Sequence, residues 1–181
     1  MEDDTSKVEF GGGTVVDRPT KILRRSGWGL IIVGALGLGI IAITIINSAG
    51  EKPDPEGVRW LVSAILWLLL LVAGGVLCFR KAQQTIAGKS KLALAGSLVS
   101  GAYLPFCGTM SIISRGNDPV SLLLTTGFTL MVLAYLVAIY LFARRALRAA
   151  AALMIVAGGL GIPLGIFAII VGLAVMRARK E

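Results

Sequence analysis

Histidine is absent from the sequence, and its absence excludes several kinds of active site. Without an imidazole, the chain has no histidine to bind a metal or haem and none to activate a serine or cysteine nucleophile. The two cysteines, Cys78 and Cys107, are too few and too far apart for a disulfide framework or a cysteine-rich zinc site. We therefore expect no metal, no cofactor and no catalytic residue, and we do not expect an enzyme.

Charged residues are scarce as well. They make up 15% of the chain, whereas 56% of the residues are hydrophobic and the mean hydropathy is +0.84. Soluble domains contain roughly 25% charged and 45–50% apolar residues. Both departures point to a chain whose solvent is lipid, so we expect an integral membrane protein.

Five apolar stretches are long enough to cross a bilayer, which takes roughly 20 residues. They carry no acidic or basic residue apart from Arg59 at the entry of the second. The linkers are too short to fold on their own. The sequence therefore predicts an all-α integral membrane protein, a compact bundle of about five transmembrane helices with spans at about 27–48, 58–79, 92–113, 120–143 and 149–176.

The last stretch, 149–176, allows two arrangements because Gly158, Gly159, Gly161 and Pro163 interrupt its middle. It could form a single tilted helix with a kink at Pro163. Alternatively, it could form a re-entrant hairpin that turns at Gly161–Pro163, giving four spans plus a hairpin. A turn at mid-membrane must be buried in protein, and this requirement outweighs three misplaced basic residues. A single fifth span is therefore the preferred prediction, and the hairpin is the alternative.

Basic residues cluster at the ends of these stretches and give the chain a net charge of +8. By the positive-inside rule they predict a cytoplasmic N-terminus in the cytoplasmic (inner) membrane. Residues 1–26 are expected to form a cytoplasmic tail, disordered at first and then basic, and residues 177–181 a basic C-terminal tail. No basic run contains interleaved aromatic residues, so we expect no nucleic-acid partner. The residues that determine this topology are Arg24, Arg25, Arg80, Lys81, Arg144 and Arg145.

Small residues recur at four-residue spacing in three of the stretches, and such faces let helices approach closely in lipid. The second stretch is instead bulky on all sides over Leu66 to Val72, and we expect it to face lipid more. The predicted helix-packing residues are Ala35 and Gly39 in the first stretch, Ala93, Ser97 and Gly101 in the third, and Ala157, Gly161 and Gly165 in the last.

A proline inside the third stretch, Pro105, predicts a bend with polar groups around it at Tyr103, Cys107 and Thr109. These groups could line a small cavity or contact a lipid. They could equally satisfy backbone groups of a bent helix, which is the preferred interpretation. Three aromatic residues are expected to anchor the helices at the membrane interfaces, namely Trp28, Trp60 and Tyr140.

No ionisable residue falls at mid-membrane, which argues against proton-coupled transport, ion selection by charge and voltage sensing. The sequence is therefore typical of a non-catalytic accessory or scaffold subunit. Its expected partners are membrane lipids and other integral membrane subunits. The alternative is a small transporter or channel for a neutral or lipidic solute.

Overall fold

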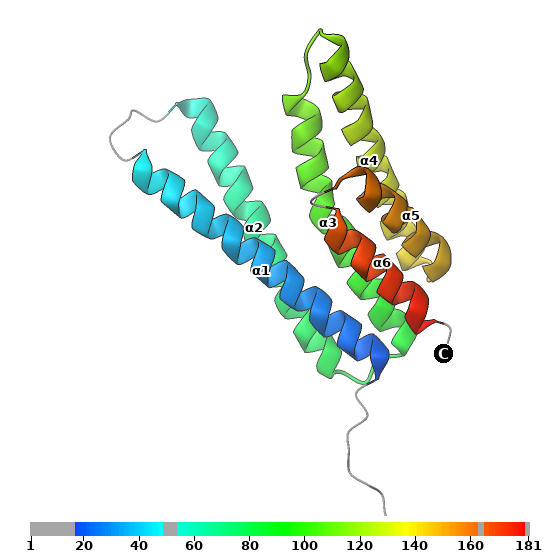
Figure 1. Ribbon diagram of the computed structural model, residues 1–181. Helices are drawn as coiled ribbons and strands as arrows, with labels where there is room; N and C mark the ends of the chain where they lie inside the picture. Colours follow the sequence, from blue (N-terminus) through cyan, green and yellow to red (C-terminus); the bar gives the residue numbers. More distant parts are fainter. Residues whose placement is uncertain (1–16, 49–53, 163–164, 180–181) are drawn as a thin grey trace, which may run out of the picture.

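A computed structural model describes residues 17–48, 54–162 and 165–179, and every element in these ranges is a helix (Figure 1). This confirms the predicted all-α membrane fold. The helices are α1 (Arg18–Asn47), α2 (Pro55–Gln83), α3 (Gly88–Ile113), α4 (Pro119–Ala143), α5 (Leu147–Leu160) and α6 (Ile166–Ala178).

Four of the helices, α1 to α4, are long and apolar enough to cross a membrane. They have 25 to 30 residues, which at a rise of 1.5 Å per residue gives roughly 37–45 Å against a hydrocarbon core of about 30 Å. The chain is thus a multi-pass membrane protein. Three of the four begin with proline in the first turn, where a missing N–H costs no hydrogen bond.

The first helix begins at Arg18, inside residues 1–26, which were predicted to form a tail. The basic residues Lys21, Arg24 and Arg25 therefore lie on the first turns of α1. The tail residues 1–16 lie outside the described residues. Hydropathy marks the part of a helix that fits in lipid, and a helix can continue beyond that part into the headgroup region.

The preferred prediction of a single fifth span is wrong. Residues 149–176 form two short helices, α5 with 14 residues and α6 with 13, that pack side by side as a hairpin. Each is about 20 Å long, too short to cross the hydrocarbon alone. The alternative arrangement of four long helices and a hairpin is the observed one. Pro163, predicted to break this stretch, lies outside the described residues.

Glycines explain why the hairpin can close. The carbonyl oxygen of Gly158 occupies the place where a side chain on Gly165 would begin, and a Cβ on Gly172 would lie 3.1 Å from the carbonyl oxygen of Ala151. The two backbones therefore touch. Each arm of the hairpin packs on the rest of the chain, α5 on α4 and α6 on α1 and α3, whereas Leu160 and Ile162 beside the turn are 71% and 61% exposed.

The helices converge at one end of the molecule and diverge at the other (Figure 1). We call the first end the basic end, because Arg and Lys side chains gather there, and the second the open end, because the α1–α2 and α3–α4 hairpins separate there. The buried residues follow this gradient: in α1 they stop at Gly34, in α3 they stop at Cys107, and in α4 they begin at Met131.

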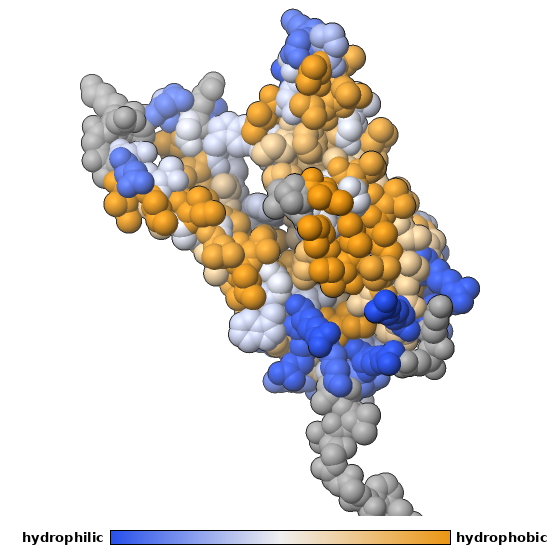
Figure 2. Space-filling view, in the orientation of Figure 1, coloured by the Kyte–Doolittle hydropathy of each residue, from blue (hydrophilic) through white to orange (hydrophobic). Residues whose placement is uncertain are grey.

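Large apolar side chains cover the outside of the helices, as Figure 2 shows for one face. Leu123 of α4 is 73% exposed and Ile46 of α1 is 71% exposed. Exposed leucine and isoleucine in such number fit a surface in contact with lipid, which supports the membrane assignment.

The α1–α2 contact uses glycines that the four-residue pattern did not identify. A Cβ on Gly27 would lie 3.0 Å from the carbonyl oxygen of Gly75, and one on Gly75 would lie 2.7 Å from that of Gly27. Two turns further along α1, a Cβ on Gly34 would lie 3.1 Å from the carbonyl oxygen of Leu68. The second stretch, expected to face lipid more, therefore has one close-packed side.

Candidate functional site

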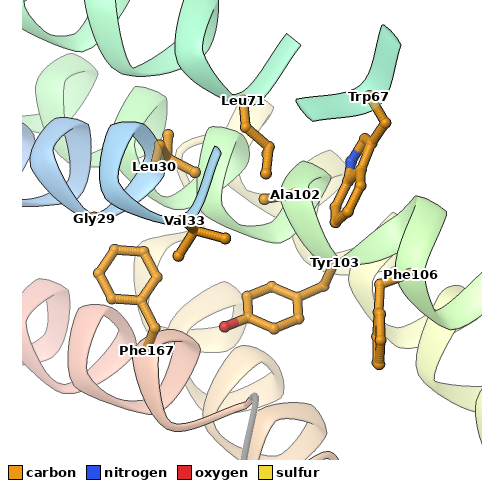
Figure 3. Close-up of a pocket in the computed structure, with 9 residues that line it drawn as sticks. All are labelled: Gly29, Leu30, Val33, Trp67, Leu71, Ala102, Tyr103, Phe106 and Phe167. Atoms are coloured by element: carbon orange, nitrogen blue, oxygen red, sulfur yellow. The ribbon is translucent and has the colours of Figure 1, made fainter. Parts of the chain in front are cut away.

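A cavity of about 150 Å³ lies where α1, α2, α3 and α6 meet, at the point from which the long hairpins diverge (Figure 3). Its wall is almost entirely apolar. The lining residues are Gly29, Leu30 and Val33 of α1, Trp67 and Leu71 of α2, Ala102, Tyr103 and Phe106 of α3, and Phe167 of α6.

The shape of the cavity depends on Gly29 and Phe167. A side chain at Gly29 would overlap the tip of the Phe167 ring, so glycine lets this ring approach α1 and line one side of the cavity. Because Phe167 belongs to α6, the cavity exists only when the C-terminal hairpin folds back onto α1 and α3. The site therefore forms only when the hairpin is folded.

Two polar groups reach the cavity. The Tyr103 ring extends across it toward α6 (Figure 3), where its hydroxyl oxygen accepts a hydrogen bond from the backbone of Ala168 in the first turn of α6. The ring also stacks on Tyr135 of α4, with centroids 5.3 Å apart and planes 16° apart. Tyr103 thus joins three helices and caps one of the free amides at the start of α6.

The second polar group is the indole N–H of Trp67. Within the described residues, this nitrogen is buried and has no hydrogen-bond partner. A buried donor without a partner costs roughly 1–3 kcal/mol. A ligand with an acceptor atom could satisfy this N–H.

Of the polar residues predicted around the bend, the structure brings only Tyr103 to the cavity. Cys107 is buried on another side of α3, among the residues that pack with α4 and α5. Thr109 is half-buried outside the cavity, and Pro105 is exposed within a helix that continues through it. The sequence could not reveal Trp67 or Phe167 as lining residues, since their positions depend on how α2 and α6 are placed.

Other hydroxyl groups satisfy the backbone. Thr44, Thr126 and Thr129 each donate to the carbonyl oxygen four residues earlier, at 2.7 to 3.0 Å. Thr125 donates across the α3–α4 turn to the carbonyl oxygen of Ser114 at 2.9 Å, and Ser111 lies 2.8 Å from the Thr129 hydroxyl. The contacts of Thr125 with Ser114 and of Ser111 with Thr129 link the two helices at the open end of the α3–α4 hairpin.

The predicted packing residues fall into two groups. In the hairpin, Ala157 is buried and Gly165 contacts Gly158, while Gly161 lies beside Met131. Ala93, Ser97 and Gly101 of α3 are half-buried on the side of α4, near Ile139. On α1, by contrast, Ala35 and Gly39 are exposed, and nothing in the described structure lies within 4 Å of a Cβ built on Gly39.

Of the predicted interface residues, Trp60 and Tyr140 stand near helix ends, and Trp28 lies about three turns inside α1. Trp28 is 56% exposed and meets Phe79 edge-to-face at 5.5 Å, and Trp60 is exposed near the start of α2. Tyr140 lies beneath the Arg144 guanidinium, whose carbon is 5.4 Å from the ring centroid. The predicted topology residues share the basic end: Arg24, Arg25, Arg80, Lys81, Arg144 and Arg145 (Figure 1).

The cavity has the size and lining to hold a small apolar group. An apolar cavity of about 150 Å³ holds a group of roughly the size of benzene. Among the described residues, no three His, Cys, Asp or Glu side chains come close enough together to hold a metal ion. Comparison of the chain with protein-family models, with curated proteins and with solved structures finds no match.

Proposed function

We propose that the protein is a non-catalytic accessory or scaffold subunit that packs against transmembrane helices of other integral membrane proteins. The observation that carries this proposal is the open end, where the two long hairpins separate and leave small residues bare. Nothing in the described structure lies within 4 Å of a Cβ built on Gly39 of α1, Gly108 of α3 or Gly127 of α4.

Bare glycines matter in lipid because burying apolar surface there gains no free energy. Helices associate in lipid through close packing, and small residues allow two backbones to approach. Gly27, Gly34 and Gly75 serve this purpose inside the chain. Ala35 and Gly39 repeat the same pattern on the exposed side of α1, so they offer a second helix the same kind of contact.

The charge distribution supports a cytoplasmic N-terminus in the cytoplasmic (inner) membrane. The basic end carries the basic residues of α1, of the α2–α3 and α4–α5 connections, and of α6. The described basic residues of the open end are Arg59 and Arg115, accompanied by Asp54 and Asp118. Cytoplasmic segments carry the excess of Lys and Arg, so we assign the basic end to the cytoplasm.

Mild extraction of the native membrane protein tests the proposal. Wild-type protein should elute with a stoichiometric membrane partner, and Gly39→Leu should release that partner because the added side chain blocks close approach. Gly159→Leu is the matched control, since Gly159 of α5 is also open but lies away from the divergent hairpins. Elution of the wild type without a partner, or equal loss of the partner from both variants, would contradict the proposal.

The cavity supports a second candidate, a small transporter or channel for a neutral or lipidic solute. The supporting observation is the unpartnered Trp67 indole N–H in an apolar cavity between four helices. Under this candidate, Trp67→Phe would change solute flux in proteoliposomes and leave association with a partner intact. Under the subunit proposal, Trp67→Phe would have no effect on either.

A further inference from the structure

A second hollow, distinct from the cavity, lies between α1 and α6 at the basic end. It is a groove of about 510 Å³ with a cationic rim of Arg18, Lys21, Arg25 and Arg177. Its floor is apolar and includes Ile170 and Leu173. Figure 2 shows hydrophilic side chains at this end of α1 and α6, next to the hydrophobic surface of both helices.

Helix periodicity explains the two walls of the groove. Residues 18, 21 and 25 follow the i, i+3, i+7 pattern of one helix face, as do residues 170, 173 and 177. The two faces are about 150 positions apart in the sequence and meet because the α5–α6 hairpin returns the chain to the basic end. A single fifth span would have placed Arg177 at the opposite end.

No acidic residue lines the groove in the part of the chain that the structure describes. Asp17, which precedes α1, points toward α3, with its carboxylate oxygen 3.8 Å from a Cβ built on Gly88. Asp17 also makes no side-chain cap on α1.

We propose that this groove binds an anionic phospholipid from the cytoplasmic leaflet. The phosphate would lie among Lys21, Arg25 and Arg177, and an acyl chain would follow Ile170 and Leu173 into the hydrocarbon. Basic pockets between transmembrane helices on the cytoplasmic side suit lipid headgroups of this charge. The apolar floor favours a lipid over a soluble anion, because a soluble anion gains nothing from it.

Titration of the purified full-length protein with phosphatidylglycerol, followed by native mass spectrometry in neutral detergent, tests the charge requirement. The triple variant Lys21→Gln, Arg25→Gln, Arg177→Gln should weaken apparent binding at least about tenfold, given the usual contribution of each base. The control triple variant Arg80→Gln, Lys81→Gln, Arg144→Gln removes the same charge from the same end outside the groove, and should bind as the wild type does. Equal loss in both variants would overturn the proposal.

A second variant tests the groove itself without changing charge. Ala174 is a half-buried residue of the groove, so Ala174→Trp should fill it and reduce phosphatidylglycerol binding. Ala152→Trp, on the exposed side of α5, should not. Binding of phosphatidylcholine as tightly as phosphatidylglycerol, or release of phosphatidylglycerol by millimolar inorganic phosphate, would contradict an anionic-lipid site. These measurements need no partner protein, so their outcome is separate from that of the subunit proposal.

Discussion

At the scale of single residues, the contact between α1 and α2 depends on two glycines that carry no side chain. Gly27 and Gly75 let the backbones of α1 and α2 meet, with Gly75 also under Ile31. No side chain of larger size fits there unless the helices separate. Helix packing in lipid rests on contacts of this kind, so a single methyl group at this point should be measurable.

We predict that Gly75→Ala destabilises the protein by about 1–3 kcal/mol, the usual cost of overpacking. Its Cβ would stand 2.7 Å from the carbonyl oxygen of Gly27. Gly39→Ala is the control, because its Cβ meets nothing within 4 Å. Thermal unfolding in detergent measures both, and equal melting temperatures for the two variants would contradict this packing.

A buried lysine, Lys91, joins three helices at the basic end. This lysine is only 8% exposed, and its ammonium nitrogen donates to the Thr20 hydroxyl at 2.7 Å and to the carbonyl oxygen of Ala82 at 3.4 Å. The Ala82 carbonyl belongs to the last turn of α2, where backbone acceptors lack partners within the helix. Lys91 therefore links α1, α2 and α3.

We expect Lys91→Met to lower the free energy of unfolding by about 1–3 kcal/mol, as loss of a hydrogen bond to a charged group usually does. Lys89→Met, at an exposed position two residues earlier, should change it little. Both variants can be compared by thermal unfolding of detergent-purified protein. A stable Lys91→Met protein would show that these hydrogen bonds contribute nothing net.

At the scale of elements, the α5–α6 hairpin was the feature that the sequence left open. Its glycines and proline allowed either one interrupted helix or two short ones. The decision depended on tertiary contacts, because α5 packs on α4 while α6 packs on α1 and α3. No local pattern carries this information.

We predict that Gly165→Leu destabilises the hairpin by about 3 kcal/mol or more, because the added side chain would displace the Gly158 backbone. The variant should show a lower melting temperature. Gly159→Leu, which meets no atom of the described chain within 4 Å, should retain that of the wild type. Wild-type stability in Gly165→Leu would mean that α5 and α6 do not touch at this point.

The start of α4 provides a prediction on pH. The Asp118 carboxylate accepts a hydrogen bond from the backbone N–H of Ser121 at 3.1 Å, and the hydrogen bonds from Ser121 hold the pKa of this carboxyl below its ordinary value. A lowered pKa means that this stabilisation is complete above the pKa of the unfolded chain and is lost as the pH falls through the folded value. The melting temperature of Asp118→Asn should therefore fall less than that of the wild type as the pH is lowered through the pKa of the folded carboxyl. Thermal unfolding at a series of acidic pH values measures this difference.

The four long helices were predictable because each needs only a run of apolar residues of sufficient length. The faces of these helices were not. Ala35 and Gly39 satisfy the four-residue pattern of small residues but are exposed, whereas Gly27 and Gly34, which lie seven residues apart, face α2. A glycine that faces lipid and one that faces a neighbour leave the same signal in the sequence.

At the scale of the whole molecule, one end is packed and basic while the other is divergent and nearly neutral in its described residues (Figures 1 and 2). The same hairpin return produces the cavity, through Phe167, and the cationic groove, through Arg177. Sequence analysis could identify Tyr103 as a polar group near a bend. It could not place Tyr103, Trp67 and Phe167 together, because three different helices bring them there.

The return of the chain to the basic end is the central claim, and the position of the C-terminus tests it most directly. A topology reporter fused after Glu181 should report the same side of the membrane as one fused at the N-terminus. A reporter fused after Ser114, at the open end, should report the opposite side. A C-terminal reporter on the side of Ser114 would contradict the hairpin, the cavity and the lipid groove together.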